Sequence, residues 1–267
     1  MVDRGFADVE GGRLYYERDG DGPALLFTGG ALDLRMWRYQ IEALSPCYSF
    51  IRCDLRGYGR SSEPTDAPYR HCDDVRVLLE ALGVDRLCLG GQSFGGTVAL
   101  DFALAYPEVV AGLILAPALP VLGWDWVEGF PVKPALEAGL RDGVDAYKQA
   151  FFELPLNASA MADPGVAPLL REMIGDYSGW HLAHRDPGRF EAPNAIGRLG
   201  EVDVPTLIVV GGDEVLDGRL VAEHMAAQLV NAEQHRIEHV GHYPNMEAPN
   251  AFNSLTLQFL ERVHTTR

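Results

Sequence analysis

The sequence predicts an α/β protein with a mostly parallel central sheet that is flanked by helices on both sides. Short apolar runs alternate with segments of helical apolar spacing along most of the 267 residues, an arrangement typical of parallel sheets. Hydrophobic residues make up 47% of the chain, enough to bury one large core. The alternation stops between about residues 119 and 200, where no strand-like run occurs. We therefore expect one α/β domain that carries a helical insertion.

The first part of the chain predicts a hairpin, two core strands and two helices. Gly11-Gly12 lies between two short apolar runs, as in a β-hairpin. Gly83 follows the second helical segment, where glycine commonly ends a helix. The expected strands are residues 6–9, 14–16, 24–27 and 49–53, and the expected helices are residues 37–44 and 75–82.

The last part of the chain continues the alternation. Residues 204–210 are rich in β-branched side chains, and residues 234–239 form a shorter run that also favours a strand. A C-terminal helix is expected because three large apolar residues share one of its faces: Phe252, Leu255 and Phe259.

Ser93 lies between Gly91 and Gly95, at the junction of a strand-like run and a helix-like segment. Residues 86–90 form the apolar run, and residues 97–106 have the helical pattern. A G-x-S-x-G sequence in this context indicates a nucleophile elbow, a strained turn that exposes the serine hydroxyl. Side chains larger than hydrogen at the two glycine positions would collide with the adjoining segments. Ser93 is therefore the candidate nucleophile.

A serine hydroxyl needs a base, and the base needs a group that orients it. Gly211-Gly212-Asp213-Glu214 follows the run 204–210, and His242 lies shortly after the run 234–239. A carboxylate and an imidazole therefore both lie just past strand ends, where an open parallel sheet builds its site. Their order along the chain is serine, acid, histidine, which is the order of the α/β-hydrolases.

The chain resembles the α/β-hydrolase fold superfamily over almost its whole length, from about Phe6 to Phe259. Three segments carry the resemblance: Asp54-Leu55-Arg56-Gly57-Tyr58-Gly59-Arg60-Ser61, Gly91-Gln92-Ser93-Phe94-Gly95-Gly96, and His239-Val240-Gly241-His242 with Glu247 and Pro249. The closest group contains enol-lactonases, small esterases, perhydrolases, carbon-carbon bond hydrolases and epoxide hydrolases. Epoxide hydrolases and haloalkane dehalogenases are disfavoured, since they have an aspartate where this chain has Ser93.

The resemblance implies which carboxylate serves the histidine. Family members commonly have Gly-x-x-Asp after this strand, and counting from Gly211 puts Glu214 in the position of the aspartate. Glutamate has this role in some members of the fold. The adjacent Asp213 stays open as the alternative acid, and Asp217 is a third candidate.

The expected oxyanion hole departs from the family pattern. The family usually has His-Gly after its third strand, whereas this chain has Thr28-Gly29-Gly30. The family histidine mostly supports the structure, and the chemistry needs backbone N–H groups that point at the developing oxyanion. We expect these two donors from Gly30 and Phe94.

Some polar residues near these motifs are expected to be structural. Asp54 and Arg56 would fix a loop through hydrogen bonds and ion pairing. Asp33 and Arg35, close to the oxyanion glycines, are expected to be exposed loop charges.

The resemblance places a helical cap over the site, in the segment without strand-like runs. The chain then divides into a first part of the hydrolase core (1–119), a cap insertion (120–200) and a second part of the core (201–267). Prolines break the cap segment into short helical pieces, and large apolar side chains are frequent in it. We expect three of these to line an apolar substrate pocket: Trp124, Phe151 and Trp180.

Composition excludes several classes of partner. With 22 basic and 38 acidic residues, the formal net charge is −16, which argues against binding to nucleic acid or to an anionic membrane. The four cysteines lack metal-ligand spacing, and we expect neither a metal nor a cofactor. Residues 1–5 contain no apolar signal core, and no apolar segment has the length of a membrane span. The expected location is the cytoplasm, and a homodimer stays open.

These features together predict a cofactor-free serine hydrolase that cleaves a small or medium apolar carboxylic ester or lactone through an acyl-enzyme. His242 would take the proton of Ser93 as the hydroxyl attacks the carbonyl, and the acid would orient the imidazole. Carbon-carbon bond hydrolysis or perhydrolysis on the same triad is the alternative reaction. A ligand-binding protein on a hydrolase fold is an alternative of another class, motivated by Thr28 and by the glutamate at the acid position.

Overall fold

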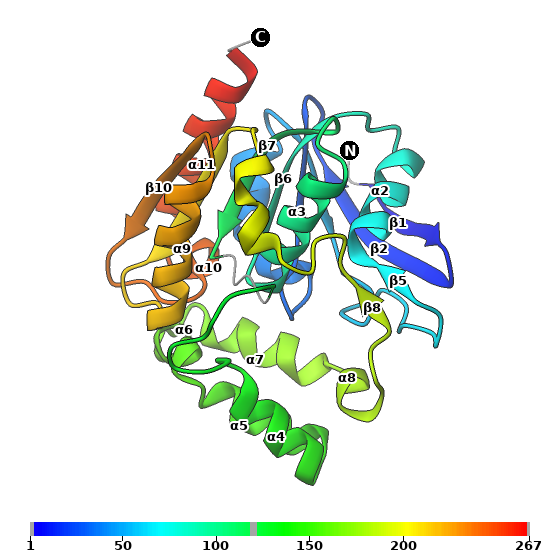
Figure 1. Cartoon of the computed structure of the whole chain (residues 1–267), viewed down its shortest axis with the longest axis vertical. Helices are drawn as coiled ribbons and strands as arrows, with labels where there is room; N and C mark the ends of the chain where they lie inside the picture. Colours follow the sequence, from blue (N-terminus) through cyan, green and yellow to red (C-terminus); the bar gives the residue numbers. More distant parts are fainter. Residues whose placement is uncertain (1–2, 118–121, 266–267) are drawn as a thin grey trace.

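An eight-stranded sheet runs through the centre of the described part of the protein and has helices on both faces (Figure 1). The computed structural model describes residues 3–117 and 122–265. The strand order is β1-β2-β4-β3-β6-β7-β9-β10. The strands are β1 (Asp3–Val9), β2 (Gly12–Asp19), β3 (Ala24–Thr28), β4 (Ser49–Cys53), β6 (Leu87–Gln92), β7 (Val110–Ala116), β9 (Thr206–Gly211) and β10 (Ala232–Ile237).

The sheet is antiparallel at one edge and parallel elsewhere. β1 pairs with β2, and β2 with β4, in antiparallel register, whereas the neighbours from β4 to β10 pair in parallel. Parallel strands have their carboxyl ends at the same edge of the sheet. The residues that follow β3, β6, β9 and β10 therefore meet at that edge. The predicted α/β class with a mostly parallel sheet is confirmed.

Two groups of helices cover the two faces of the sheet. One face is covered by α2 (His71–Ala81), α3 (Phe94–Ala105) and α9 (Leu216–Gln228), and the other by η1 (Leu34–Gln40), α1 (Ile41–Leu44) and α11 (Pro249–Thr265). Alternate residues of a strand point to opposite faces. In β3, Leu26 joins the first core, and its neighbours Leu25 and Phe27 join the second. The short elements η3 (Ala195–Glu201) and α10 (Pro244–Glu247) complete this part.

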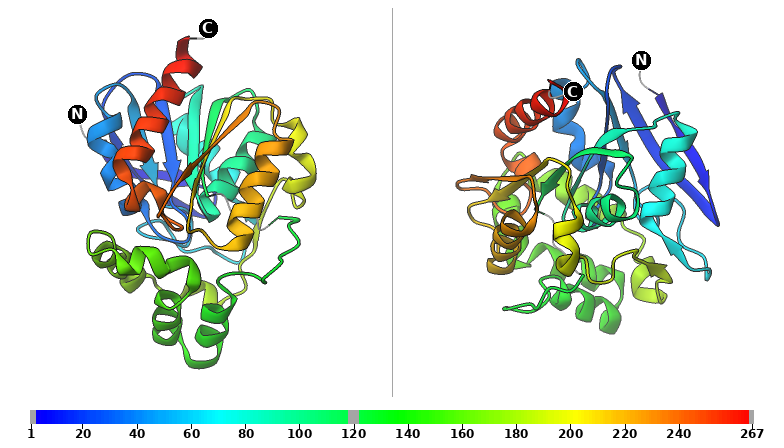
Figure 2. Two further views of the ribbon diagram at one scale, coloured as in Figure 1. Left: turned by 90° about the vertical axis from the view of Figure 1, so that its left-hand side faces the viewer. Right: turned by 45° about the horizontal axis from the view of Figure 1, so that its top comes forward.

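The segment expected to form the cap, for which we use the name cap, is mainly helical and lies beyond one end of the sheet (Figures 1 and 2). Its elements are α4 (Lys133–Asp142), α5 (Val144–Phe152), η2 (Pro155–Asn157), α6 (Ala158–Ala162), α7 (Ala167–Asp176) and α8 (Trp180–Ala183). One short strand, β8 (Gly188–Arg189), pairs with β5 (Tyr69–Arg70). The expectation that this segment contains no strand is therefore wrong. The predicted first boundary of the cap, between residues 119 and 120, lies outside the described residues.

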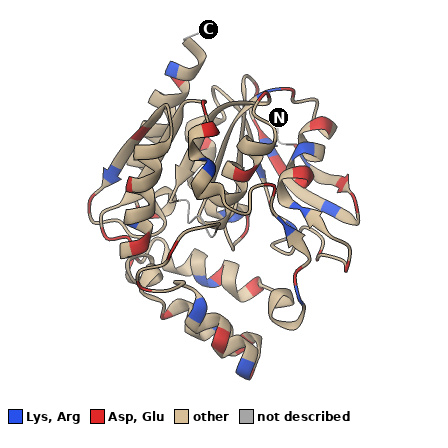
Figure 3. Ribbon diagram, in the orientation of Figure 1, with Lys and Arg blue, Asp and Glu red and all other residues tan. Residues whose placement is uncertain are grey.

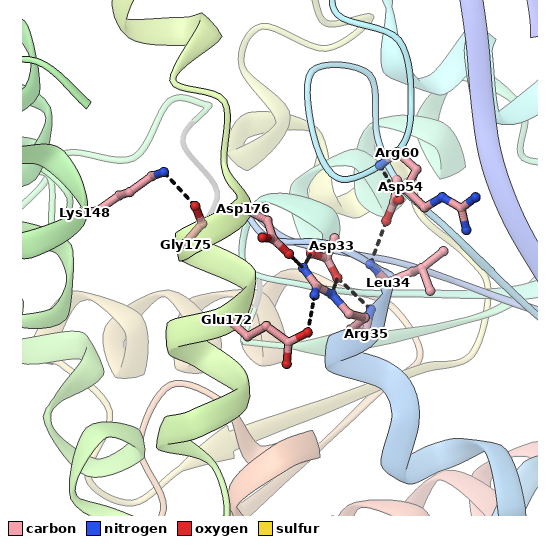
Figure 4. A network of polar contacts seen from close by, with 9 residues as sticks. All are labelled: Asp33, Leu34, Arg35, Asp54, Arg60, Lys148, Glu172, Gly175 and Asp176. Atoms are coloured by element: carbon pink, nitrogen blue, oxygen red, sulfur yellow. Dashed lines mark hydrogen bonds and ion pairs between the residues drawn. The ribbon is translucent and has the colours of Figure 1, made fainter. Parts of the chain in front are cut away.

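Arg35, in η1 of the core, binds two carboxylates of the cap and one beside it in the core (Figure 4). Its guanidinium nitrogens lie 2.6 Å from Oδ2 of Asp33, 2.7 Å from Oε1 of Glu172 and 2.8 Å from Oδ2 of Asp176. Glu172 and Asp176 belong to α7, whereas Asp33 caps η1 in the core. The expectation of exposed loop charges at Asp33 and Arg35 is wrong, because Asp33 is only 5% exposed and Arg35 pairs with the cap.

Asp54 holds the start of η1 from the core side (Figure 4). Its carboxylate accepts hydrogen bonds from the amides of Leu34 (2.7 Å) and Arg60 (2.8 Å). Burial raises the pKa of Asp54 to about 7. Arg56 donates two hydrogen bonds to Asp74, at 2.8 and 2.7 Å. The expectation that Asp54 and Arg56 fix loops is confirmed.

Acidic and basic residues occur on both the core and the cap (Figure 3). No helix in residues 3–117 and 122–265 combines the length and the apolar character that a membrane span needs. The same residues contain no group of three or more His, Cys, Asp or Glu side chains that could hold a metal ion. The four cysteines are free thiols, of which Cys47 is exposed and the others are buried.

Asp217, in the first turn of α9, holds the segment through which the chain enters the cap. Its carboxylate accepts hydrogen bonds from Nε1 of Trp124 (3.0 Å) and from the amides of Val127 (2.8 Å) and Glu128 (2.9 Å). Burial by itself raises the pKa of Asp217, but the three donors outweigh it and lower the pKa below its ordinary value. Asp217, the third candidate for the acid, therefore holds the segment that leads into the cap.

We predict that Asp217→Asn lowers the free energy of unfolding by about 1–3 kcal/mol at pH 7, because the three N–H donors lose their charged acceptor. The pKa of Asp217 is lower in the folded state than in the unfolded state. The ionised carboxylate therefore stabilises the fold at pH values above the ordinary pKa of about 4. This stabilisation is lost as the pH falls through the pKa of Asp217 in the folded state. The difference between the two proteins should therefore narrow below about pH 4.

Urea unfolding at a series of pH values measures this difference. Asp125→Asn, an exposed position in the same segment, is the control and should change the free energy of unfolding by less than about 0.5 kcal/mol. A difference for Asp217→Asn that stays constant from pH 7 to pH 3 would contradict the assignment.

Candidate active site

Ser93 has a strained backbone at the junction of β6 and α3. Its φ and ψ are 52° and −122°, and positive φ is uncommon for a residue with a side chain. A Cβ atom added to Gly91 would overlap the carbonyl of Gly95, and one added to Gly95 would lie 2.5 Å from the carbonyl oxygen of Gly29. The predicted collisions are confirmed, so the two glycines allow the strand to turn directly into the helix.

Thr28, at the end of β3, supports this turn from the neighbouring strand. Its hydroxyl donates to the carbonyl of Gly95 in α3 (3.0 Å). Its own carbonyl accepts a hydrogen bond from Nε1 of Trp37 (3.2 Å), and the side chain is fully buried. The threonine that replaces the family histidine therefore links β3 to the helix that follows Ser93.

His242 and Glu214 form a buried pair on the loops after β10 and β9. Nδ1 of His242 lies 2.6 Å from Oε2 of Glu214, and the two side chains are 2% and 0% exposed. The other oxygen of Glu214 accepts from the amide of Val215 (2.8 Å). With a carboxylate on Nδ1, we assign the imidazole proton to that nitrogen, which leaves Nε2 as an acceptor. Asp213 is exposed, so the structure brings Glu214 and not Asp213 to the imidazole.

Gln92 links the nucleophile strand to the loop that carries the histidine. Its Nε2 donates to the carbonyl of His242 (2.8 Å). Its Oε1 lies 2.8 Å from the position that a Cβ atom on Gly30 would occupy, and the same position is 3.4 Å from Cβ of Ser93. The buried amide of Gln92 therefore lies between the backbone of His242 and Gly30, and Gly30 lies beside Ser93.

The two predicted oxyanion donors differ in their surroundings. Phe94 is the first residue of α3, and the first amides of a helix have no acceptor within the helix. The amide of Gly30 donates to Sδ of Met36 (3.4 Å). A thioether is a weak acceptor, so an oxyanion next to Ser93 would compete for this amide with little opposition.

The aromatic residues predicted to line the pocket lie in different parts of the cap segment. Phe151 packs in the second hydrophobic core. The ring of Trp124 meets His224 of α9 edge-on, with 5.7 Å between ring centroids. Trp180 stacks on His184 at 4.9 Å. Substrate binding by Trp124, Phe151 and Trp180 stays a prediction.

Other aromatic residues, not predicted from the sequence to line a pocket, surround Phe94. Its ring centroid lies 5.3, 6.1 and 6.2 Å from those of His71, Phe190 and Tyr58. Tyr58 in turn stacks on His181 of α8 (4.7 Å). Burial lowers the pKa of His71 to about 4, so its ring is neutral at pH 7. Tyr58 belongs to the family-like motif after β4, which is the sequence signal that could have identified it.

Known proteins resemble this chain over nearly its whole length. The profile of the family described as alpha/beta hydrolase fold matches residues 23–249. A Variovorax paradoxus protein provisionally named carbamate hydrolase RutD is 31% identical over 259 residues, or 94% of this chain and 97% of the relative. A thermophilic esterase from Thermogutta terrifontis has a TM-score of 0.83 and 28% identity, with 98% and 99% of the two chains covered. Est816, described as an N-acyl homoserine lactone degrading enzyme, has a TM-score of 0.79 and 27% identity, with 96% and 100% covered.

We predict that Thr28→Val lowers the free energy of unfolding by about 1–2 kcal/mol, because the buried carbonyl of Gly95 loses a donor while the side-chain volume is kept. Thr256→Val is the matched control. The Thr256 hydroxyl is buried without a hydrogen-bond partner in the described part of the chain, so its removal should be neutral or stabilising. Urea unfolding of the three proteins checks this, and equal losses for the two variants would contradict it.

Proposed function

The chain belongs to the α/β-hydrolase family, and we propose that it is a cofactor-free serine hydrolase of small or medium apolar carboxylic esters or lactones. The observation that carries the proposal is the buried pair of His242 and Glu214, with Nδ1 2.6 Å from Oε2. Gln92, the residue before the strained Ser93, binds the backbone carbonyl of His242. A carboxylate on one imidazole nitrogen leaves the other free to act as the base for a serine. The fold by itself would not support the proposal, since similar folds host unrelated functions.

In the proposed reaction, Nε2 of His242 takes the proton of the Ser93 hydroxyl as its oxygen attacks the substrate carbonyl. Glu214 holds the required tautomer and stabilises the imidazolium that forms. The amides of Gly30 and Phe94 stabilise the oxyanion, and Gly30 exchanges its thioether partner for it. The imidazolium then protonates the leaving alcohol, and water attacks the acyl-enzyme with His242 again as the base.

An apolar substrate suits the surroundings of the nucleophile. Phe94, next to Ser93, contacts aromatic rings from the core and from the segment after the cap helices, including Tyr58 and Phe190. The net charge of −16 disfavours a strongly anionic substrate. The similar structures of an esterase and of a lactone-degrading enzyme support esters and lactones as the substrate class.

A carbamate is the second candidate substrate, because the relative at 31% identity carries that provisional name. Attack on a carbamate carbonyl would use the same nucleophile, base and oxyanion donors. Carbon-carbon bond hydrolysis and perhydrolysis also use this triad and are tested by the same variants.

We further propose that the protein works in the cytoplasm on small molecules, without nucleic acid or membrane as a partner. The excess of acidic residues disfavours nucleic acid and anionic membranes as partners. The four free thiols suit a reducing compartment such as the cytoplasm. Light scattering on the purified protein distinguishes a monomer from a homodimer, and cell fractionation tests the location.

We predict that the protein hydrolyses nitrophenyl esters or simple lactones, and that Ser93→Ala lowers kcat roughly 10⁴-fold or more. A panel of esters with increasing acyl length, simple lactones and aryl carbamates would measure the preferred class and the size of the pocket. Equal rates in the two proteins, or no turnover in either, would reject the ester and lactone proposal.

Glu214→Gln should lower kcat roughly 10³–10⁴-fold, because an amide beside Nδ1 favours the wrong imidazole tautomer. Asp213→Asn is the matched control, since Asp213 is exposed and next to Glu214. Its kcat should stay within about threefold of the unchanged protein. Kinetics on the best ester of the panel decide, and a larger loss for Asp213→Asn would assign the acid to the exposed residue.

A further inference from the structure

We propose that Glu247 is a positioning residue that ties the alignment of His242 to the cap. The inference rests on the proposed function, in which His242 is the base, and it assigns a role to a residue outside the triad. It is carried by hydrogen bonds on both sides of His242 and by the approach of the cap to the same carboxylate.

Glu247, in α10, binds the backbone on both sides of His242. Its Oε2 accepts from the amide of Gly241 (2.9 Å), and its Oε1 accepts from the amide of Tyr243 (2.9 Å). Hydrogen bonds to an ionised carboxylate are stronger than those between neutral groups. Because one carboxylate binds both flanking amides, the backbone of His242 has little freedom to turn.

The cap reaches the same carboxylate. The hydroxyl of Ser159, in α6, donates to Oε2 of Glu247. Close by, the hydroxyl of Tyr243 donates to Oδ1 of Asn157 in η2 (2.7 Å). A Cβ atom added to Gly241 would lie only 2.7 Å from Cβ of Ser159, so the cap touches the loop backbone where glycine leaves room. Residues 157–159 of the cap therefore pack against the loop that carries His242, which we call the histidine loop.

The core holds His242 through different atoms. Glu214 binds Nδ1 (2.6 Å), and Gln92 binds the backbone carbonyl (2.8 Å). Glu247 holds the amides on either side of the residue, and one of its two oxygens also takes the Ser159 hydroxyl from the cap. A displacement of α6 would remove that donor and change the contact that fixes the loop. Core and cap therefore align the imidazole jointly.

The Arg35 contact on α7 is a second link between cap and core and provides a control. The side chains of Glu172 and Asp176 are 60% and 65% exposed, so solvent and salt screen these ion pairs. Glu172→Gln weakens this link and leaves the contacts of Glu247 unchanged. It separates a general loosening of the cap from a specific effect on His242.

The test measures how fast a fluorophosphonate labels Ser93, because this reagent reports the activation of the serine without knowledge of the natural substrate. Glu247→Gln keeps the shape of the side chain and replaces one acceptor oxygen with a donor. Its labelling rate and its kcat on the best ester should fall about tenfold or more, with KM changed less than about twofold. Ser159→Ala should lower the same rates about two- to fivefold, and Glu172→Gln should leave them within about twofold.

The outcomes separate the two proposals. No labelling of the unchanged protein would reject the proposed function and the inference with it. Labelling of the unchanged protein, together with equal labelling of Glu247→Gln, would overturn the positioning role and leave the proposed function standing. A rise in KM without a fall in kcat would also overturn it, because it would place Glu247 in substrate binding. If Glu247→Gln fails to fold by circular dichroism, Ser159→Ala decides, and an unchanged labelling rate overturns the inference.

Discussion

Close backbone contact at the turn between β6 and α3 is the constraint on which the rest of the site depends. Without side chains on Gly91 and Gly95, the strand, the helix and the chain after β3 can touch. The amide of Ser93 donates to the carbonyl of Pro117 (2.7 Å), just past β7, and Thr28 holds the helix from the other neighbouring strand. The strained conformation persists because both neighbours of β6 hold it in a closely packed interior.

The parallel sheet then places the ends of β9 and β10 at the same edge as this turn. β9 and β10 are neighbours, and Gly211 pairs with Ile237 where the two strands end. Glu214 and His242 therefore need only short loops to meet. β7 separates β6 from β9, and the side chain of Gln92 spans the distance that remains to the histidine loop. The sheet sets the positions of these groups, and individual hydrogen bonds set their orientations.

The fold and the order of the motifs could be predicted because local patterns encode them: apolar runs, glycine spacing and polar residues at strand ends. Counting from Gly211 favoured Glu214 over Asp213, but the residues alone left both open, because the direction of adjacent side chains is decided only when the loop folds. The burial of Asp33 was missed for a related reason. Its partner Arg35 also binds Glu172, 137 residues later in the chain, and no local pattern records such a contact.

Cap and histidine loop are expected to evolve together where Ser159 lies against Gly241. A cap transplanted from another family member would need a small residue with a hydroxyl at this point, or it would push the loop away from the serine. The exposed ion pairs of Glu172 and Asp176 restrict the sequence less. Exchange should therefore be tolerated more readily at the exposed acidic positions of α7 than where α6 meets the histidine loop, which makes the two ends of one cap unequal targets for natural selection and for recombination libraries.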